Sequence, residues 1–249
     1  LIQAGAILAQ VDVLAALAEL AIRHGYVRPE LVAEPVFVID SGRHPVLDAL
    51  MPAGEFVPND TNLDPTSSSI LVITGPNMAG KSTFLRALGT NTVLAFSGAP
   101  VIARHFVVPP CELGTSLRIS DSLLTGTSHF YAEVKKLAHV VHLSREGRRV
   151  FFLLDEVLHG TNSRERQIGA RWVLADLLEH GAFGVVTTHD EGLCQLPEPL
   201  MSRVRQHHFR ESVEAGEMTF DYLLRPGPVT SGNALRLMQK VGLDVPLDG

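Results

Sequence analysis

Hydrophobic and polar positions along the chain predict alternating helices and strands. Residues 2–22 are helix formers with one early glycine and no proline, and Gly25 and Pro29 end this predicted helix. Runs of β-favouring side chains then alternate with segments of helical spacing. Strands are expected at residues 35–40, 70–73, 100–108, 150–154 and 182–186, and further helices at residues 84–94 and 130–141. This order is typical of an α/β fold.

Polar, turn-forming residues predict the connections. Ser41 and Gly42 indicate a turn after the strand at residues 35–40, and residues 51–69 are rich in Pro, Asn, Asp, Thr and Ser, which predicts mostly loop. Phe56 stands within this loop. An aromatic side chain just before such a strand either stacks on a nucleotide base or plugs the core, and the residues alone leave both readings open.

The strand at residues 70–73 leads into TGPNMAGKST, which contains the pattern G-x-x-x-x-G-K-[ST] and precedes a helix. Gly75 and Gly80 allow tight turns whose N–H groups point at phosphates. Lys81 supplies a positive charge for the outer phosphates, and the Ser82 hydroxyl completes the coordination of Mg²⁺. The other expected ATP-binding residues are Pro76, Asn77, Met78, Ala79 and Thr83. The alternative is an ordinary strand, turn and helix. We call residues 75–82 the phosphate loop.

Two later strands also end in polar side chains. The apolar residues 150–154 are followed by Asp155 and Glu156, where a phosphate-loop enzyme holds Mg²⁺ and polarises the attacking water. Residues 182–186 lead to His189, which would lie near the γ-phosphate if the strands are neighbours. The alternatives are a solvated acidic turn and a structural histidine.

Ser128 precedes the helix predicted at residues 130–141 and has two interpretations. A serine there caps the helix by accepting a backbone hydrogen bond. It can also bind a γ-phosphate, because its hydroxyl lies beside free N–H groups at the positive end of the helix. Spacing alone favours the cap.

Composition limits the classes of protein that fit. The 249 residues, 45% hydrophobic and 19% charged, suffice for one large core or one core plus a small appendage. A net charge of −6 argues against a main surface that grips a phosphate backbone. The two cysteines, Cys111 and Cys194, suggest a reducing compartment, and we expect a cytoplasmic location.

The start of the chain adds two expectations. No uninterrupted apolar run reaches the roughly 18 residues that cross a bilayer, and no basic leader is present, so we expect a soluble chain with no membrane partner. Leu1 stands inside a helical pattern with neither an initiator Met nor an N-cap before it. We therefore expect a domain excised from a longer protein.

Together these segments resemble the ATPase domain of the MutS family, a branch of the ABC-type ATPases used in DNA mismatch repair and related tasks. The likeness covers nearly the whole chain and rests on AQVDVLAALAELA, GRHPVL, FVPND, TGPNMAGKST, LLDE, GTNS and TTHD in that order. It implies a P-loop NTPase of ABC type at residues 30–249, with a mixed central sheet flanked by helices. Residues 1–25 would be the C-terminal end of a connecting, or lever, helix. TGTSHFYAE and HGTNSRERQIGA are closer to divergent MutS-related proteins than to the mismatch sensor.

The resemblance also implies roles for single residues. Phe56 would stack on adenine, Asn77 would line the phosphate loop, and Ser82 and Asp155 would hold Mg²⁺. Glu156 would act on the water, with Lys81 and His189, the switch histidine, as the other catalytic residues. Gly160, Thr161 and Asn162 would form a loop that crosses to a partner subunit, and Ser128 would close over the partner's ATP.

The implied function is Mg²⁺-dependent ATP hydrolysis that couples the nucleotide state to DNA handling. The expected partners are a second copy, joined through the ATP sites, and DNA held by domains absent from this chain. One alternative is an ATP-gated clamp module without mismatch recognition. Another is a transport-type ABC ATPase, which would carry an LSGGQ-like signature and a glutamine loop, and neither is visible in the sequence.

Overall fold

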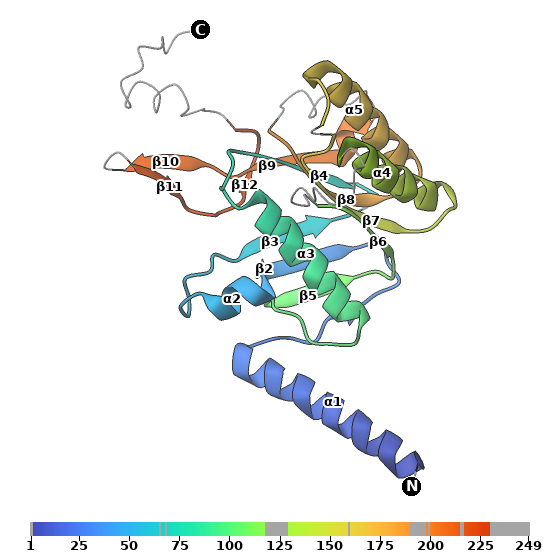
Figure 1. Cartoon of the computed structure of the whole chain (residues 1–249), viewed down its shortest axis with the longest axis vertical. Helices are drawn as coiled ribbons and strands as arrows, with labels where there is room; N and C mark the ends of the chain where they lie inside the picture. Colours follow the sequence, from blue (N-terminus) through green and yellow to red (C-terminus); the bar gives the residue numbers. More distant parts are fainter. Residues whose placement is uncertain are drawn as a thin grey trace.

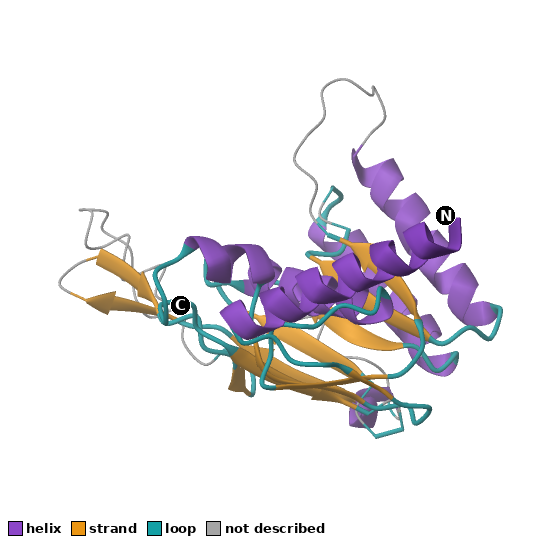
Figure 2. Ribbon diagram, turned by 90° about the horizontal axis from the view of Figure 1, so that it is seen from below, coloured by secondary structure: helices purple, strands orange, loops and turns teal. Residues whose placement is uncertain are grey.

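The computed structural model describes residues 2–64, 66–67, 69–117, 129–158, 160–189, 198, 200–214 and 217–229. Within these residues, two larger sheets and a hairpin combine with flanking helices in a mixed α/β architecture (Figure 1). Figure 2 gives the same arrangement from below, with strands in orange and helices in purple.

The larger sheet, here the main sheet, has the strand order β12-β9-β4-β8-β7-β6. Its strands are β4 (Ile70–Thr74), β6 (Glu112–Ser116), β7 (Val150–Asp155), β8 (Phe183–Thr187), β9 (Val204–His208) and β12 (Arg225–Pro226). All neighbours pair in parallel except β12, which is antiparallel to β9. Every residue of β4, β7 and β8 is buried, as expected for parallel strands covered on both faces. Their carboxyl ends therefore meet at one edge.

One face of the main sheet packs on α3 (Lys81–Phe96) and on a second sheet. The second sheet has the order β1-β5-β2-β3, formed by β1 (Glu30–Leu31), β5 (His105–Val108), β2 (Phe37–Gly42) and β3 (Asn59–Leu63), and α2 (Pro45–Leu50) follows β2. Phe37 of this sheet meets Phe151 of β7 with ring centroids 4.5 Å apart, and Phe151 stacks on Phe183. These aromatic contacts join the two sheets.

The other face of the main sheet is covered by α4 (His129–Arg145) and α5 (Ser163–Glu179). The two helices lie side by side in Figure 1, and Arg145 near the end of α4 forms an ion pair with the nearly buried Asp176 of α5. The Arg145 guanidinium also lies 5.5 Å from the ring centre of Trp172. Hydrogen bonds from Arg145 hold the pKa of Asp176 below its usual value. The short helix η2 (Leu200–Arg203) and the hairpin of β10 (Glu211–Glu214) and β11 (Glu217–Phe220) complete the described elements.

Helix α1 (Ile2–His24) projects away from the sheets (Figure 1). Its large apolar side chains are mostly exposed, among them Ile7, Leu14 and Ile22 at 61%, 65% and 84%. Residues Gln3–His24 have a mean hydropathy of 1.8 over an 18-residue window, so by length and composition this helix could cross a membrane. Gln10 and Asp12 interrupt the apolar residues of this helix, but the average over the window stays apolar, and the expected absence of a membrane partner stays a prediction. Length and composition alone do not make a helix a membrane span.

The predicted helices and strands exist, but three predictions about the connections were wrong or incomplete. Residues 51–69 are mostly loop as predicted, but the prediction missed Asn59–Leu63, which forms β3 against β2. Ser41 and Gly42 do not end the strand before them. They belong to β2, whose register shifts between Ile39 and Gly42 while Ser41 adopts a positive φ of 51°. Helices α2 and α5 and strands β1, β6, β9, β10, β11 and β12 were not predicted.

Candidate functional site

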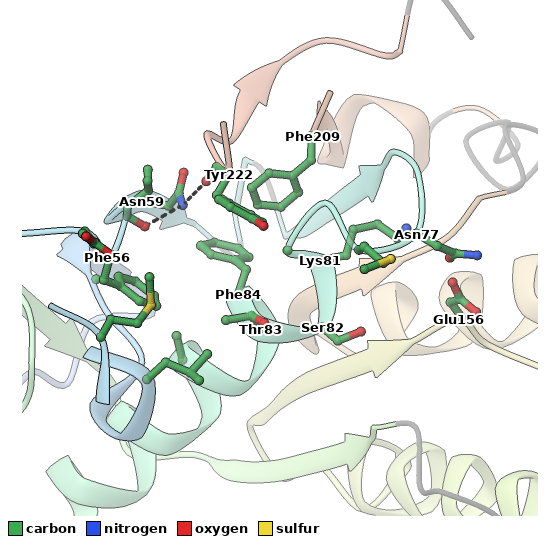
Figure 3. Close-up of a pocket in the computed structure, with 18 residues that line it drawn as sticks. Phe56, Asn59, Asn77, Lys81, Ser82, Thr83, Phe84, Glu156, Phe209 and Tyr222 are labelled. Atoms are coloured by element: carbon green, nitrogen blue, oxygen red, sulfur yellow. Dashed lines mark hydrogen bonds between the residues drawn. The ribbon is translucent and has the colours of Figure 1, made fainter. Parts of the chain in front are cut away.

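A cavity of about 650 Å³ opens at the carboxyl edge of the main sheet. The phosphate loop and the first turns of α3 supply one part of its lining, and the rest comes from α2, from the ends of β2 and β3, and from loops. Figure 3 shows Phe56 and Glu156 on opposite sides of the view, with Lys81 and Ser82 between them. The main cavity is lined by Gly42, Leu47, Met51, Glu55, Phe56, Val57, Asn59, Asn77, Met78, Gly80, Lys81, Ser82, Thr83, Phe84, Ala87, Glu156, Phe209 and Tyr222.

The two glycines of the phosphate loop adopt backbone conformations that favour glycine. Gly75 has φ 137° and Gly80 has φ 104°. A Cβ at Gly75 would stand 2.5 Å from the carbonyl oxygen of Phe209, so the chain leaves no room for a side chain there. Gly80 is the N-cap of α3 and makes no side-chain cap, which leaves the N–H groups of the first turn to other acceptors. This is the geometry of an anion site at a helix N-terminus.

Lys81 is buried, and its ammonium Nζ donates to the carbonyl oxygens of Gly75 and Pro76, at 2.7 and 2.8 Å. These bonds hold the positive charge at the phosphate loop. Ser82 and Thr83 follow it in the first turn of α3 and line the main cavity. Among the other predicted ATP-binding residues, Asn77 and Met78 also line it, whereas Ala79 packs into the core.

Asp155 ends β7 and is 5% exposed. Its Oδ1 accepts a hydrogen bond of 2.6 Å from the Thr187 hydroxyl of β8. Within the described part of the chain, the buried Oδ2 has no hydrogen-bond partner. A buried carboxylate oxygen with open coordination suits a hard cation such as Mg²⁺, so this position fits the predicted metal site. The described residues include no group of three His, Cys, Asp or Glu side chains that could hold a metal, so Mg²⁺ would need Ser82, waters and phosphate oxygens as well.

Glu156 lies in the turn directly after β7 and has a positive φ of 51°. Its N–H donates to Thr187, to the carbonyl oxygen at 3.1 Å and to the hydroxyl at 3.2 Å. The side chain of Glu156 is 8% exposed and lines the main cavity, and its Oε1 lies 3.8 Å from Nδ1 of His189. The structure therefore brings the two predicted catalytic residues together, because β8 pairs directly with β7.

Two aromatic residues of the main cavity escaped sequence reasoning. Phe209 follows β9 and is 1% exposed, with its ring 6.2 Å from that of Phe84 in α3. Tyr222 lies close to the phosphate loop: a Cβ added to Gly80 would stand 3.3 Å from Cδ1 of Tyr222. No motif marks either residue, since both stand in the polar C-terminal region that carried no recognisable pattern.

Asn59 fixes the segment that carries Tyr222. Its Nδ2 donates to the carbonyl oxygen of Tyr222 at 2.9 Å, drawn dashed in Figure 3, and its Oδ1 accepts from the N–H of Leu224 at 2.7 Å. Next to Tyr222, hydrogen bonds from Arg225, the Leu223 N–H and Arg210 lower the pKa of Asp221 to about 2. The segment that carries Tyr222 is thus bonded both to Asn59 of β3 and to Arg225 of β12.

The predicted subunit-crossing residues lie beyond the main cavity. Asn162 is the N-cap of α5 and accepts the N–H of Glu165 at 3.0 Å, while the Thr161 hydroxyl donates to the Glu165 carboxylate. A Cβ on Gly160 would stand 2.8 Å from Cβ of Phe130 in α4. These contacts give the three residues a local structural role. Ser128, the predicted signature residue, lies outside the described residues.

Comparison with known proteins supplies the family. Residues 71–246 match the family described as MutS domain V. The chain belongs to the MutS family. Its relatives include proteins named DNA mismatch repair protein MutS from Rhodopirellula baltica, 35% identical over 96% of this chain, and from Thermus aquaticus, 37% identical over 97%. The chain spans only 27% and 28% of the length of these relatives.

The match places most of the site inside the MutS domain. Lys81, Asp155, Glu156 and His189 fall within residues 71–246, as do Phe209 and Tyr222. Phe56 and Asn59 precede the matched segment, so the far wall of the main cavity comes from the part of the chain before domain V begins. The resemblance read from the sequence is confirmed at the level of the family. Its closeness to divergent members stays a prediction.

Proposed function

We propose that this chain binds ATP in the main cavity and hydrolyses it with Mg²⁺, as an ABC-type P-loop ATPase. The observation that supports this best is the shared cavity lining of Lys81, Ser82 and Glu156. These residues come from two separate strand ends, and only the pairing of β4, β8 and β7 brings them to one place. A phosphate-binding loop next to a nearly buried carboxylate is the arrangement that transfer of a phosphoryl group to water requires.

The phosphates would lie against the phosphate loop. The N–H groups of the first turn of α3 and the Lys81 ammonium would bind the phosphate oxygens. The hydrogen bonds from Lys81 to the carbonyl oxygens of Gly75 and Pro76 hold its ammonium against the phosphate loop. Ser82 and Asp155 would hold Mg²⁺, which supplies positive charge to the phosphate oxygens. Asp155 keeps its orientation through the Thr187 hydroxyl.

Glu156 would accept a hydrogen bond from the attacking water and orient it toward the γ-phosphate. His189, 3.8 Å from the Glu156 carboxylate, would sense the γ-phosphate and respond to its loss. Phe56 would stack on adenine at the far end of the main cavity, and Tyr222 lies near enough to Gly80 to cover the base or sugar. The cavity volume of about 650 Å³ accommodates a nucleotide.

A direct test compares ATP binding and hydrolysis by the chain and by Lys81→Ala. Loss of a charge-assisted contact of roughly 1.5–3 kcal/mol should weaken ATP binding by about tenfold or more. A fluorescent ATP analogue reports affinity, and released phosphate reports turnover. A chain that neither binds nor hydrolyses ATP, or a variant that binds it unchanged, would contradict the proposal. Lys135→Ala, an exposed lysine on α4, is the matched control.

We further propose that two copies dimerise through their ATP sites. Ser128 of one copy would close over the ATP of the other, and Gly160, Thr161 and Asn162 would cross the interface. Light scattering on Glu156→Gln, with and without Mg-ATP, tests this. Twice the monomer mass only with Mg-ATP supports the composite site, and a monomer that binds ATP contradicts it for this chain.

The biological role that fits best is coupling of the ATP state to DNA handling. The support is the name of the relatives, DNA mismatch repair protein MutS. DNA would be held by regions outside this chain, and α1 would link them to the ATPase core as a lever within residues 1–25, with residues 30–249 forming that core. We place this activity in the cytoplasm.

A further inference from the structure

A buried carboxylate on α4 contacts the backbone beside the proposed catalytic residue. Glu133 is 8% exposed, and its Oε1 accepts a hydrogen bond of 2.6 Å from the N–H of Leu158. The bond spans 25 residues of sequence and joins the first turns of α4 to the turn after β7. The bond satisfies a backbone N–H that would otherwise be buried without a partner in this contact.

The acceptor position matters because the turn is strained. Glu156 and Leu158 have φ values of 51° and 58°, in the left-handed region that glycine favours. A non-glycine residue in this region costs of order 1–3 kcal/mol and stays there only where its surroundings hold it. Residues 156–158, which we call the Glu156 turn, contain no glycine. Contacts from other elements must therefore keep its shape.

Helices α4 and α5 also pack closely against the Glu156 turn and the residues that follow it, at two glycines. The Cβ position of Gly169 in α5 lies 2.8 Å from Cδ1 of Leu158, and that of Gly160 lies 2.8 Å from Cβ of Phe130 in α4. Leu158 is 7% exposed and belongs to the core between the main sheet and these helices. The Glu156 turn is thus enclosed by α4 and α5 on one side and bonded to Thr187 of β8 on the other.

We infer that Glu133 is a positioning residue, which sets the place of the Glu156 carboxylate by holding the N–H of Leu158. This inference rests on the proposed ATPase function. Since Glu133 stands in the second turn of α4, a shift of the N-terminal end of that helix moves the acceptor and, through two residues of backbone, Glu156. Hydrolysis thereby depends on the position of α4. A misplacement of about 1 Å at a reacting group can cost roughly 100-fold in rate, so even a small shift is felt.

A purely structural role for Glu133 predicts a different result. A buried acid that only ties two elements together would, when removed, lower stability, ATP affinity and turnover together. A positioning role predicts a loss confined to turnover, with local loosening at the Glu156 turn. Glutamine keeps a side-chain oxygen that can accept the Leu158 N–H, so Glu133→Gln should rescue what Glu133→Ala loses.

The experiment measures kcat, KM and ATP affinity for the whole chain and for Glu133→Ala, Glu133→Gln and His139→Ala. His139 is exposed on the same helix and serves as the control. We expect Glu133→Ala to lower kcat about tenfold with KM and ATP affinity within about twofold, Glu133→Gln to recover most of kcat, and His139→Ala to match the parent chain. Amide hydrogen exchange should speed up in the peptide that contains Leu158 for Glu133→Ala alone, and not in β4 or β8.

Several results would overturn the inference. They are an unchanged kcat in Glu133→Ala, an equal loss of ATP affinity, or faster exchange spread over the whole main sheet. If Glu133→Ala does not fold, Gly169→Ala replaces it. Its new Cβ pushes on Cδ1 of Leu158, and the same loss of kcat at unchanged ATP affinity is expected. If the parent chain does not hydrolyse ATP, the proposed function fails, while unchanged exchange at Leu158 in Glu133→Ala would still refute the positioning role by itself.

Discussion

Two turns at the same edge of the main sheet solve the same problem in different ways. The phosphate loop after β4 places positive φ values at Gly75 and Gly80, where glycine adopts them without strain. The Glu156 turn after β7 also has positive φ values, 51° at Glu156 and 58° at Leu158, and there the contacts from Glu133 and Thr187 hold them. The first conformation is encoded locally, and the second is imposed by tertiary contacts.

The difference has a functional side. The phosphate loop takes most of its shape from its own glycines, with Met78 as its non-glycine residue at positive φ, and it therefore depends less on its neighbours, which suits a phosphate cradle. A turn held by side chains from α4 and β8 changes when those elements move, which suits a residue whose activity has to be regulated. The variants below break or sharpen this contrast, from the largest expected effect to the smallest.

The largest effect is expected for Gly75→Ala. The new Cβ would lie 2.5 Å from the Phe209 carbonyl oxygen, and the backbone there has a φ of 137°. Overpacking and backbone strain together should lower the free energy of unfolding by roughly 3 kcal/mol. ATP binding should be lost with it. Urea denaturation measures the free energy of unfolding, and a fluorescent ATP analogue measures nucleotide binding.

Gly98→Ala is the matched control for that variant, because Gly98 has a φ of 78° with open space around its Cβ position. It carries the backbone strain without the clash and should cost only about 1 kcal/mol. Equal losses in the two variants would mean that the close approach of Phe209 to the phosphate loop is unimportant.

Glu156→Gln should leave ATP affinity nearly unchanged and lower turnover about 100-fold, the usual scale for a lost general base. The amide keeps the size of the side chain, so the turn keeps its shape. Phosphate release under saturating ATP measures the effect, with Glu179→Gln at the exposed end of α5 as control. Normal turnover in Glu156→Gln would remove this residue from the mechanism.

Asp176→Asn removes the ion pair between the C-terminal ends of α4 and α5, the two helices whose N-terminal halves contact the Glu156 turn. Arg145 lowers the pKa of Asp176 below its usual value of 3.8. The ion pair therefore stabilises the fold at pH values above 3.8, and this stabilisation is lost as the pH falls through the lower pKa of the folded state. The variant should lose about 1 kcal/mol near neutral pH, and the gap should narrow below about pH 4. The measurement is the urea midpoint of the chain and of the variant near neutral pH and below about pH 4, with Asp12→Asn on exposed α1 as control. A difference in stability between chain and variant that is the same at both pH values would contradict this prediction.

The smallest effect is expected for Met78→Gly. Met78 has a φ of 69° and an exposure of 83%, so glycine relieves strain at little packing cost and should raise the unfolding free energy by less than about 1 kcal/mol. Met218→Gly in strand β11 should do the opposite, by about 0.5–1 kcal/mol. Thermal denaturation of both variants decides whether the phosphate loop stores strain at its one non-glycine position with positive φ.

The same contrast explains what the sequence could reveal. Gly75, Gly80, Lys81 and Ser82 stand at fixed spacing behind an apolar strand, so both the local fold and the chemistry are predictable. Asp155, Glu156 and His189 follow buried strands, and parallel pairing then brings these strand ends together. Their closeness follows from the topology once the strands are recognised.

Other parts depend on partners far along the chain and leave no local signal. Asn59–Leu63 reads as loop because its residues are mostly polar, yet it pairs as an edge strand with Thr61 and Leu63 facing inward. Tyr222 is held beside the main cavity by Asn59, 163 residues earlier in the sequence. Glu133 looks like an ordinary polar residue of a helix, and only the fold gives it the Leu158 N–H as donor.

The position of β4 has a consequence for synthesis of the chain. The strand before the phosphate loop pairs on one side with β8 and on the other with β9, and both are synthesised later, since they follow β4 in the sequence. Until then β4, with all five residues apolar or Thr, presents two open edges, which are templates for aggregation. A ribosome that stalls between Thr187 and Val204 would thus leave a chain that carries the complete phosphate loop but only one of the two strands that pair with β4.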